Sequence, residues 1–226
     1  IFADHDYEVT VYPTRARLDC TRKVLEDAGR FDLVVCCGGD GTLNEMVSGM
    51  MQRQDRRPMG YIPLGSTNDL AVSLRLPTRV EEAALRAVTG NEFHMDVGTL
   101  NDRYFNYIAA FGAFTETSYA TPQEIKNALG HLAYILEGVK SLGKILPIHV
   151  KITADDEQFE EDYLFGAVTN TISLGGVLKL DPEKVLLDDG MYELLLVKNP
   201  TNALEAQAML SAIMTQNFDG PLVKMF

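Results

Sequence analysis

The sequence predicts an α/β N-terminal domain, in which helices cover a parallel sheet, followed by a mostly antiparallel β domain with a helical insertion. Up to residue 90, short apolar runs alternate with segments of helical periodicity, and such alternation requires crossover connections between parallel strands. After residue 90, apolar–polar alternation is broken by short turn sequences, as in hairpins. We expect the two domains to span residues 1–91 and 92–226.

The elements of the N-terminal domain are predicted from local composition and periodicity. Runs rich in Val, Ile, Tyr and Cys predict strands, and apolar residues at helical spacing predict helices. The expected strands are 8–12, 33–37 and 59–62. The expected helices are 19–28, 42–51, 67–74 and 80–88, with Gly29 and Gly90 as stop signals. A sheet of this kind usually begins with a strand, so we expect its first strand to precede residue 1.

The C-terminal domain is expected to contain two hairpins, a further strand and the helical insertion. The first hairpin pairs 93–100 with 103–111, and the second pairs 147–154 with 159–168. The further strand is 193–198, after an Asp-Gly turn, and the helical insertion runs from residue 122 to about 142. The sequence Asp219-Gly220-Pro221 indicates a surface turn.

Composition excludes several classes of protein. The net charge of −12, with no basic stripe, argues against nucleic-acid binding. Three cysteines without a C-x-x-C pair indicate a reducing cytoplasm rather than a disulfide framework. No apolar run is long enough to span a bilayer.

The motif Gly38-Gly39-Asp40-Gly41-Thr42 carries the most information. It follows an apolar strand and precedes an amphipathic segment, so it predicts a strand–turn–helix corner. Glycines allow the backbone to approach a ligand closely, and the free N–H groups of the helix start favour an anion. The spacing of Thr42 and Glu45 fits a capping box, which predicts Thr42 as the helix N-cap.

The carboxylate of Asp40 suggests phosphoryl transfer. Beside a polyphosphate, a carboxylate needs a cation or a proton, and the Walker lysine is absent from this sequence. The alternative interpretation is a tight turn with a solvated Asp40.

A second corner, Gly65-Ser66-Thr67-Asn68-Asp69, follows the next predicted strand. Carboxyl ends of parallel strands meet at one edge of a sheet, so Asp40 and Asp69 could flank one metal–phosphate centre. In the alternative interpretation, Ser66 or Thr67 is only an N-cap and Asp69 is a first-turn acid.

A third candidate site is the segment Leu186–Met191, which contains Asp188-Asp189-Gly190. Asp-Gly is a common hairpin turn. A turn carboxylate and neighbouring carbonyl oxygens could equally hold Mg²⁺.

These residues together resemble the bacterial diacylglycerol kinase and lipid kinase family, which is related to sphingosine kinases and more distantly to NAD kinases. The matching stretches are Gly38–Glu45, Pro63–Asp69, Asn170-Thr171 with Gly175-Gly176, Leu187–Gly190, and Tyr119–Gly138. GGDGT alone is shared with NAD kinases, whereas its continuation Leu43-Asn44-Glu45 and the P-L-G-x-T-N-D corner are much more specific to lipid kinases.

The resemblance implies an NAD-kinase-like N-terminal fold, ATP and Mg²⁺ as cofactors, and specific residues for each. The implied nucleotide-binding residues are Thr14, Gly38, Gly39, Asp40, Gly41, Thr42, Leu43, Asn44, Glu45 and Ser66. Asp40 and Asp69 match the catalytic acids that organise Mg²⁺ and its waters, and Ser66 stands where the family more often has Thr. The implied ligands of a structural Mg²⁺ are the Asp189 carboxylate and the carbonyl oxygens of Leu186 and Met191.

Two family elements fall outside the sequence as given. A phosphate-contacting N-P-x-S-G turn is expected before residue 1, and a D-G-E segment carrying the general base is expected beyond residue 226. We therefore expect both ends of the fold to be missing, and residues 1–226 by themselves to be inactive unless these segments are supplied.

The function implied is transfer of the γ-phosphate of ATP to the hydroxyl of diacylglycerol or a similar lipid, giving phosphatidic acid for phospholipid biosynthesis. The alternatives are an NAD kinase and a catalytically silent nucleotide-binding regulatory module. We expect a cytoplasmic protein, peripheral to the inner membrane face, with a homodimer as a reasonable assembly. A basic–apolar stretch is one candidate for the membrane contact, and a core helix is the other interpretation; its residues are Lys126, Lys140, Leu142, Lys144, Ile145 and Leu146.

Overall fold

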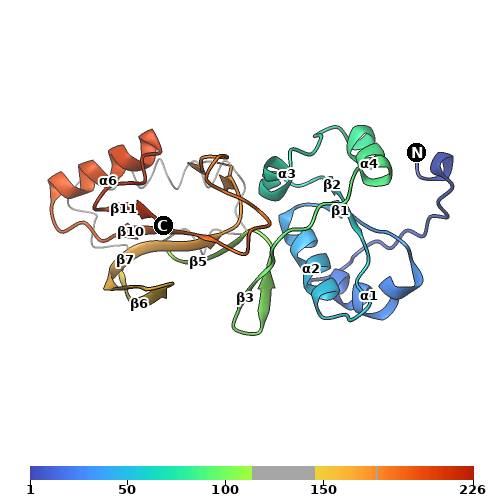
Figure 1. Cartoon of the computed structure of the whole chain (residues 1–226), viewed down its shortest axis with the longest axis horizontal. Helices are drawn as coiled ribbons and strands as arrows, with labels where there is room; N and C mark the ends of the chain where they lie inside the picture. The colour runs from blue at the N-terminus through green and yellow to red at the C-terminus, as the bar shows by residue number, and fades with distance from the viewer. Residues whose placement is uncertain (114–145, 177) are drawn as a thin grey trace. The chain divides into compact units, whose positions relative to one another are not determined.

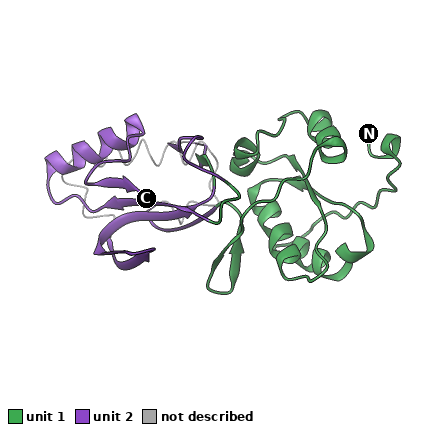
Figure 2. Ribbon diagram, viewed as in Figure 1, with its two compact units in different colours: residues 1–107, 171–173, 187–190 green, residues 108–170, 174–186, 191–226 purple. Residues whose placement is uncertain are grey.

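A computed structural model describes residues 1–113, 146–176 and 178–226, which form two compact units (Figure 2). Unit one consists of residues 1–107, 171–173 and 187–190; unit two consists of 108–170, 174–186 and 191–226. The expected division at residue 91 stays a prediction, and the hairpin at 98–105 lies in unit one.

Unit one is built on two parallel strands, β1 (Val34–Gly38) and β2 (Met59–Pro63). Their register pairs Val34 with Met59 at one end and Gly38 with Pro63 at the other. Helix α2 (Asp40–Met51) forms the crossover between the strands, as the alternation of apolar runs predicts. Both glycine-containing corners therefore follow the carboxyl ends of paired strands.

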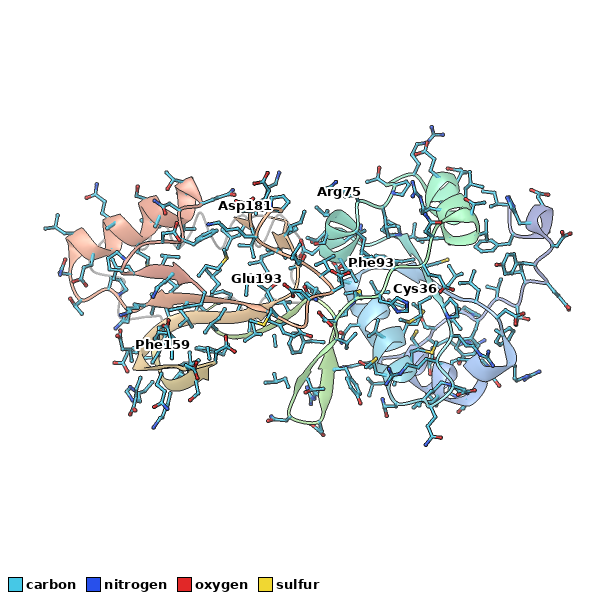
Figure 3. All side chains as sticks on the ribbon, in the orientation of Figure 1. Cys36, Arg75, Phe93, Phe159, Asp181 and Glu193 are labelled. Atoms are coloured by element: carbon cyan, nitrogen blue, oxygen red, sulfur yellow. The ribbon has the colours of Figure 1, made fainter. Side chains whose placement is uncertain are left out.

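Helices cover both faces of this sheet (Figure 1). They are α1 (Asp19–Asp27), α2, α3 (Asp69–Ser73) and α4 (Val80–Thr89), with 3₁₀ turns at Ala3–His5 and Ala28–Arg30. Cys36 and Tyr61 pack with α1, α2 and α3, whereas Val35 and Ile62 pack with α4. This division follows from the two-residue repeat of a strand. Figure 3 places Cys36 inside this unit.

The strand predicted at residues 8–12 is wrong. These residues take no strand pairing, and Val9 and Val11 are exposed. Among the described residues, β1 pairs only with β2 in this sheet. Alternation of Val and Tyr favours an extended chain, but a strand also requires a neighbour that accepts its hydrogen bonds.

Other element predictions are confirmed with shifted ends. The helix expected at 19–28 ends at Asp27 and continues as the 3₁₀ turn that contains Gly29. The helix expected at 67–74 is shorter in the structure, where α3 spans only Asp69–Ser73. Helix α4 ends at Thr89, and Gly90 is its C-cap. Strands β3 (Gly98–Leu100) and β4 (Arg103–Phe105) form the core of the first expected hairpin.

Unit two contains an antiparallel sheet in the order β11-β10-β7-β5, with β6 also paired to β7. The strands are β5 (Ile108–Gly112), β6 (Ile148–Ala154), β7 (Glu157–Thr169), β10 (Glu193–Lys198) and β11 (Val223–Met225). The β6–β7 hairpin and β10 confirm the sequence prediction. The remainder of the expected strand 103–111 is β5, which pairs with β7 instead of continuing the first hairpin.

Short strands and one further helix complete the described elements. Strands β8 (Ser173–Leu174) and β9 (Leu178–Lys179) pair with each other. Helix α6 (Ala203–Thr215), absent from the sequence prediction, buries Ala206 and Met209. The helical insertion expected at 122–142 and the lysines at 126, 140 and 144 lie outside the described residues.

Among the described residues, none of the helices combines the length and the apolar character needed to cross a bilayer.

Candidate functional site

The two glycine-containing corners of unit one lie against each other. The backbone N–H of Leu64 donates a 2.8 Å hydrogen bond to the carbonyl of Gly38. A Cβ atom added to Gly65 would lie 2.5 Å from the Cα of Gly39, a distance too short for two carbon atoms. Only glycine allows this approach of the two backbones. The structure thus brings together the two corners that the sequence singled out.

Helix α2 begins two residues earlier than expected, at Asp40, and Gly39 is its N-cap. The prediction of Thr42 as the N-cap is wrong. Gly39 has extended backbone angles (φ −92°, ψ −175°), so the chain passes directly from strand to helix. Thr42 is the third helical residue, and its side chain packs against Gly38, where an added Cβ would lie 2.9 Å away.

Asp40 lies beside the start of α3. The backbone N–H groups of Asn68, Asp69 and Leu70 near its carboxylate lower its pKa, but burial has the larger effect and raises the pKa above the ordinary value. The Oδ1 atom of Asp40 is buried without a hydrogen-bond partner among the described residues. A buried carboxylate oxygen in this condition is suited to an external donor or a cation.

Two buried phenols share this electrostatic environment. Burial is the main cause that raises the pKa of both Tyr61 and Tyr107, and the negative charges of Asp40 and Asp69 raise it further. Both side chains therefore stay neutral and keep an O–H donor at neutral pH. The Tyr61 hydroxyl donates a 3.2 Å hydrogen bond to Oδ1 of Asn68.

Asn68 holds the second corner in shape. Its backbone is left-handed (φ 55°, ψ 50°), a conformation that Asn tolerates better than most residues. Its Oδ1 accepts the N–H of Gly65 at 2.8 Å, and its Nδ2 donates to the Gly65 carbonyl at 2.7 Å. The alternative prediction of Ser66 or Thr67 as N-cap is therefore wrong, since Asn68 occupies that position. Ser66 is exposed.

Asp69 is buried in a network of hydroxyl groups. Asp69 is only 2% exposed, and its Oδ1 accepts a 2.6 Å hydrogen bond from the Oγ of Ser173. Ser73, one turn further along α3, lies 2.5 Å from the Oγ1 of Thr171 and accepts the N–H of Ile172. Segment 171–173 of unit one thus fixes α3 from a distant part of the sequence.

Sequence reasoning missed Ser73 and Ser173. Asn170-Thr171 belonged to the stretches that suggested the family, which was the available signal for this segment. Spacing alone could not pair it with α3, because Ser173 and Asp69 are 104 positions apart.

Asn44 and Glu45 anchor other segments to α2. Asn44 Oδ1 accepts the N–H of Asn106 at 3.3 Å, and its Nδ2 donates to the Tyr104 carbonyl at 3.4 Å. The Glu45 carboxylate accepts the N–H groups of Leu18 at 2.8 Å and of Cys20 at 3.3 Å. Glu45 therefore caps the start of α1 and does not complete the expected capping box.

The other predicted nucleotide-binding residues differ in exposure. Leu43 is buried in the core of unit one, and its backbone N–H donates a 3.0 Å hydrogen bond to the Gly39 carbonyl, so both groups serve the fold. Gly41 is exposed in the first turn of α2, with open space where a Cβ would stand. Thr14 is exposed in the extended segment before α1.

The three candidate ligands of a structural metal lie on the loop before β10. Asp189, Leu186 and Met191 are all exposed, and Gly190 has a positive φ of 77°. Within unit one, Oδ2 of Asp96 accepts the Gly190 N–H at 2.6 Å, and the Asp96 N–H donates to the Leu187 carbonyl at 2.8 Å. Asp96, which sequence reasoning missed, thus holds this loop.

Oxygen groups dominate the candidate site. Across residues 1–113, 146–176 and 178–226, no three His, Cys, Asp or Glu side chains converge into a metal-binding cluster. The set expected on the 186–191 loop contains one carboxylate and two carbonyls, a combination of oxygen ligands that suits Mg²⁺.

A glycine-rich corner at the carboxyl end of a parallel strand, next to a buried acid, defines this chain as an α/β protein with a candidate phosphate-binding site. The family model described as "Diacylglycerol kinase catalytic domain" matches residues 1–100. The diacylglycerol kinase of Staphylococcus carnosus (strain TM300) is 33% identical over 221 residues, which cover 96% of this chain and 71% of the relative. The chain therefore belongs to the diacylglycerol kinase family.

Further comparisons agree with this family. The diacylglycerol kinase of Bacillus subtilis (strain 168) is 38% identical over 199 residues, which cover 87% of this chain. A crystal structure described as a diacylglycerol kinase from Bacillus anthracis str. Sterne matches with a TM-score of 0.71 and 29% identity, covering 94% of this chain and 70% of that one. The chain spans 65% of the length of the Bacillus subtilis relative and 63% of that from Staphylococcus saprophyticus.

Proposed function

We propose that the protein containing residues 1–226 is an ATP- and Mg²⁺-dependent lipid kinase. It transfers the γ-phosphate of ATP to the hydroxyl of diacylglycerol or a similar lipid and produces phosphatidic acid. The observation that carries this proposal is the Gly39–Gly65 contact, which places the two acidic corners side by side within unit one. The names of the relatives supply the substrate class.

The residues of the first corner fit a bound triphosphate. The first N–H groups of a helix lack intrahelical partners, and α2, with 12 residues, presents such groups beside Gly39. A glycine inside a helix costs roughly 0.5–1 kcal/mol relative to alanine. Gly41 has no packing neighbour that would justify this cost, so its open space suits a ligand that approaches the backbone.

The same corner fits a magnesium ion that accompanies the phosphates. Mg²⁺ prefers oxygen ligands and keeps several of its waters. The buried Oδ1 of Asp40 has no partner among the described residues, so it can accept a hydrogen bond from a metal-bound water or contact the cation. When bound, the ion would neutralise charge on the transferring phosphoryl group.

Each part of the site then has a defined role. Asp40 orients the hydrated cation, and Asp69, held by Ser173, maintains the start of α3 beside it. The N–H groups of residues 41 and 42 bind the phosphates, and Thr14, Gly38, Thr42 and Ser66 complete the nucleotide site. Asn44 and Glu45 support it by anchoring neighbouring segments. Positioning and electrostatics provide most of the rate enhancement in phosphoryl transfer.

The remaining roles that we propose are those that the family resemblance suggests. Residues 1–91 bind the nucleotide and residues 92–226 the lipid, and Asp189 with the carbonyls of Leu186 and Met191 binds a structural Mg²⁺. The protein acts at the cytoplasmic face of the membrane as a peripheral enzyme and forms a homodimer.

A kinase assay on the natural protein that contains residues 1–226 tests the activity. Labelled ATP and Mg²⁺ are supplied with diacylglycerol, a sphingoid base, ceramide or phosphatidylglycerol in separate vesicle preparations, and with NAD in solution. We expect labelled phosphatidic acid from diacylglycerol, and no product when Mg²⁺ is chelated. Phosphorylation of NAD alone would refute the proposal, as would binding of nucleotide with no labelled product from any acceptor.

A further inference from the structure

The side chain of Asn106 is the least explained polar group in unit one. Asn106 is 1% exposed, and neither its Nδ2 nor its Oδ1 has a hydrogen-bond partner among the described residues. Burying an unpaired amide destabilises a fold by about 1–3 kcal/mol for each unsatisfied group. An apolar side chain of similar size would avoid this cost. The amide is therefore best explained by a bound ligand that supplies its hydrogen-bond partners.

Hydrogen bonds to the side chain of Asn44 place the segment that contains Asn106 beside the first turns of α2. The Asn106 N–H donates to Oδ1 of Asn44, whose Nδ2 donates to the Tyr104 carbonyl two residues earlier. Asn44 and Asp40 are four residues apart on α2 and therefore share one face of the helix. The next residue, Tyr107, lies within electrostatic range of both Asp40 and Asp69.

Oδ1 of Asp40 and the Asn106 amide, which have no hydrogen-bond partner within the described ranges, thus lie along the same part of α2. Asp40 Oδ1 can only accept a hydrogen bond while the carboxylate is ionised, whereas the Asn106 amide offers both an acceptor and two donors. Waters bound to a divalent cation act as donors, and phosphate oxygens act as acceptors. A hydrated metal–phosphate group is therefore a ligand that satisfies both side chains.

We propose that Asn106 is a binding residue for the metal–nucleotide complex, accepting from a metal-bound water through Oδ1 and donating to a phosphate oxygen through Nδ2. This inference rests on the proposed function in its choice of ligand. It also explains why a buried amide with no hydrogen-bond partner among the described residues stands at this position. Asn44 then has a second task, which is to hold the Asn106 backbone in place.

The variant Asn106→Leu separates ligand binding from folding. Leu has a similar size but no polar atoms, so the thermal midpoint of the ligand-free protein should stay level or rise. The Kd for a non-hydrolysable Mg·ATP analogue, measured by calorimetry, should increase about tenfold or more, as expected for loss of hydrogen bonds to charged groups. The matched control is Asn91→Leu, an exposed position in the same unit, which should change neither quantity.

A second variant, Asn106→Asp, keeps an acceptor and removes the donor. It should lower the affinity for the nucleotide while reducing the Mg²⁺ concentration needed for half-maximal binding. An Asn106→Leu protein that binds the analogue within twofold of the wild type would overturn the inference. So would loss of the folded state in both variants, because that result would make the amide a structural group.

These measurements are independent of lipid turnover. If the wild-type protein binds Mg·ATP but phosphorylates no lipid, the proposed function fails and the role of Asn106 is still decided by the two binding constants. If the wild-type protein binds no Mg·ATP, both proposals fail.

Discussion

The hydroxyl of Ser173 donates a 2.6 Å hydrogen bond to Oδ1 of Asp69, and both residues are almost fully buried. The bond joins the first residue of α3 to the segment that follows β7, within unit one. It keeps the Asp69 side chain in one orientation, with its backbone N–H close to the Asp40 carboxylate. This relationship explains how a distant serine contributes to the acidic corner.

Replacing Ser173 should destabilise unit one. In Ser173→Ala, Asp69 loses a buried donor, and the free energy of unfolding should fall by about 1–3 kcal/mol. Urea unfolding monitored by circular dichroism measures the change. The control is Ser211→Ala on the exposed face of α6, for which we expect no more than a small gain. Equal stabilities of the two variants would contradict the importance of the Ser173–Asp69 bond.

The contact between the two corners predicts opposite effects for two glycines. Gly65→Ala places a Cβ 2.5 Å from the Cα of Gly39, where backbone must move, so stability should fall by about 1–3 kcal/mol. Gly41→Ala adds a methyl group in open space within α2, so stability should rise by about 0.5–1 kcal/mol.

The same pair of variants also tests the nucleotide site. The new methyl group of Gly41→Ala occupies space that we assign to the ligand, so its affinity for Mg·ATP should fall despite the more stable fold. Thermal midpoints with and without nucleotide report both quantities. A Gly41→Ala protein that binds Mg·ATP with normal affinity would contradict the assignment of the open space at Gly41 to the nucleotide.

Asp40→Asn should separate stability from activity. The turnover number should fall on the order of 10²-fold or more, as for loss of one preorganised electrostatic group. Burial raises the pKa of Asp40, so its ionised form is unfavourable in the folded protein. Above this raised pKa the wild type bears the cost of a buried charge and Asp40→Asn should be the more stable protein.

The pH dependence follows with a defined sign. As pH falls through the raised pKa of Asp40, the folded wild type binds a proton and gains stability relative to the variant. The stabilities of the wild type and Asp40→Asn should therefore converge as pH falls, and unfolding curves of both proteins at a series of pH values measure this change. The exposed Asp32→Asn, which removes a surface carboxylate from the same unit, serves as the control. Near-normal turnover of Asp40→Asn would reject the role given to this carboxylate.

His149 predicts a separate pH effect in unit two. Its Nδ1 lies 2.8 Å from Oδ1 of Asp162, and this hydrogen bond is the main cause that raises its pKa above 6.5. A raised pKa means that the contribution to stability is complete below pH 6.5 and is lost as pH rises through the folded-state pKa. The stability difference between the wild type and His149→Gln should therefore shrink with rising pH. A difference that grows with pH would contradict this assignment.

Local patterns were sufficient to predict several elements in each of the two units. Strands β1 and β2, helix α4 and the β6–β7 hairpin formed where composition and turn residues predicted them. Helix α6 was missed because its sequence is nearly uncharged and lacks a clear polar face. Its start did carry a usable signal, since Asn202 accepts the Glu205 N–H while Glu205 accepts the Thr201 N–H, in the manner of a capping box.

Errors arose where a short motif had two possible uses. The capping-box spacing of Thr42 and Glu45 was real in the sequence, but Gly39 starts the helix and Glu45 reaches the start of α1 instead. The alternating segment 8–12 had strand composition and no pairing partner among the described residues. In both places the choice depended on which neighbour supplied the hydrogen bonds.

The sequence by itself determined the two corners, their glycines and the acids Asp40 and Asp69, because turn geometry and strand alternation act over only a few residues. Tertiary structure alone decided that Ser173 holds Asp69, and that the Asn106 amide lies beside α2 with no hydrogen-bond partner in the described part of the chain. Such pairings join residues many positions apart, and they depend on how whole elements pack. No local periodicity encodes them, whereas burial makes each one energetically significant.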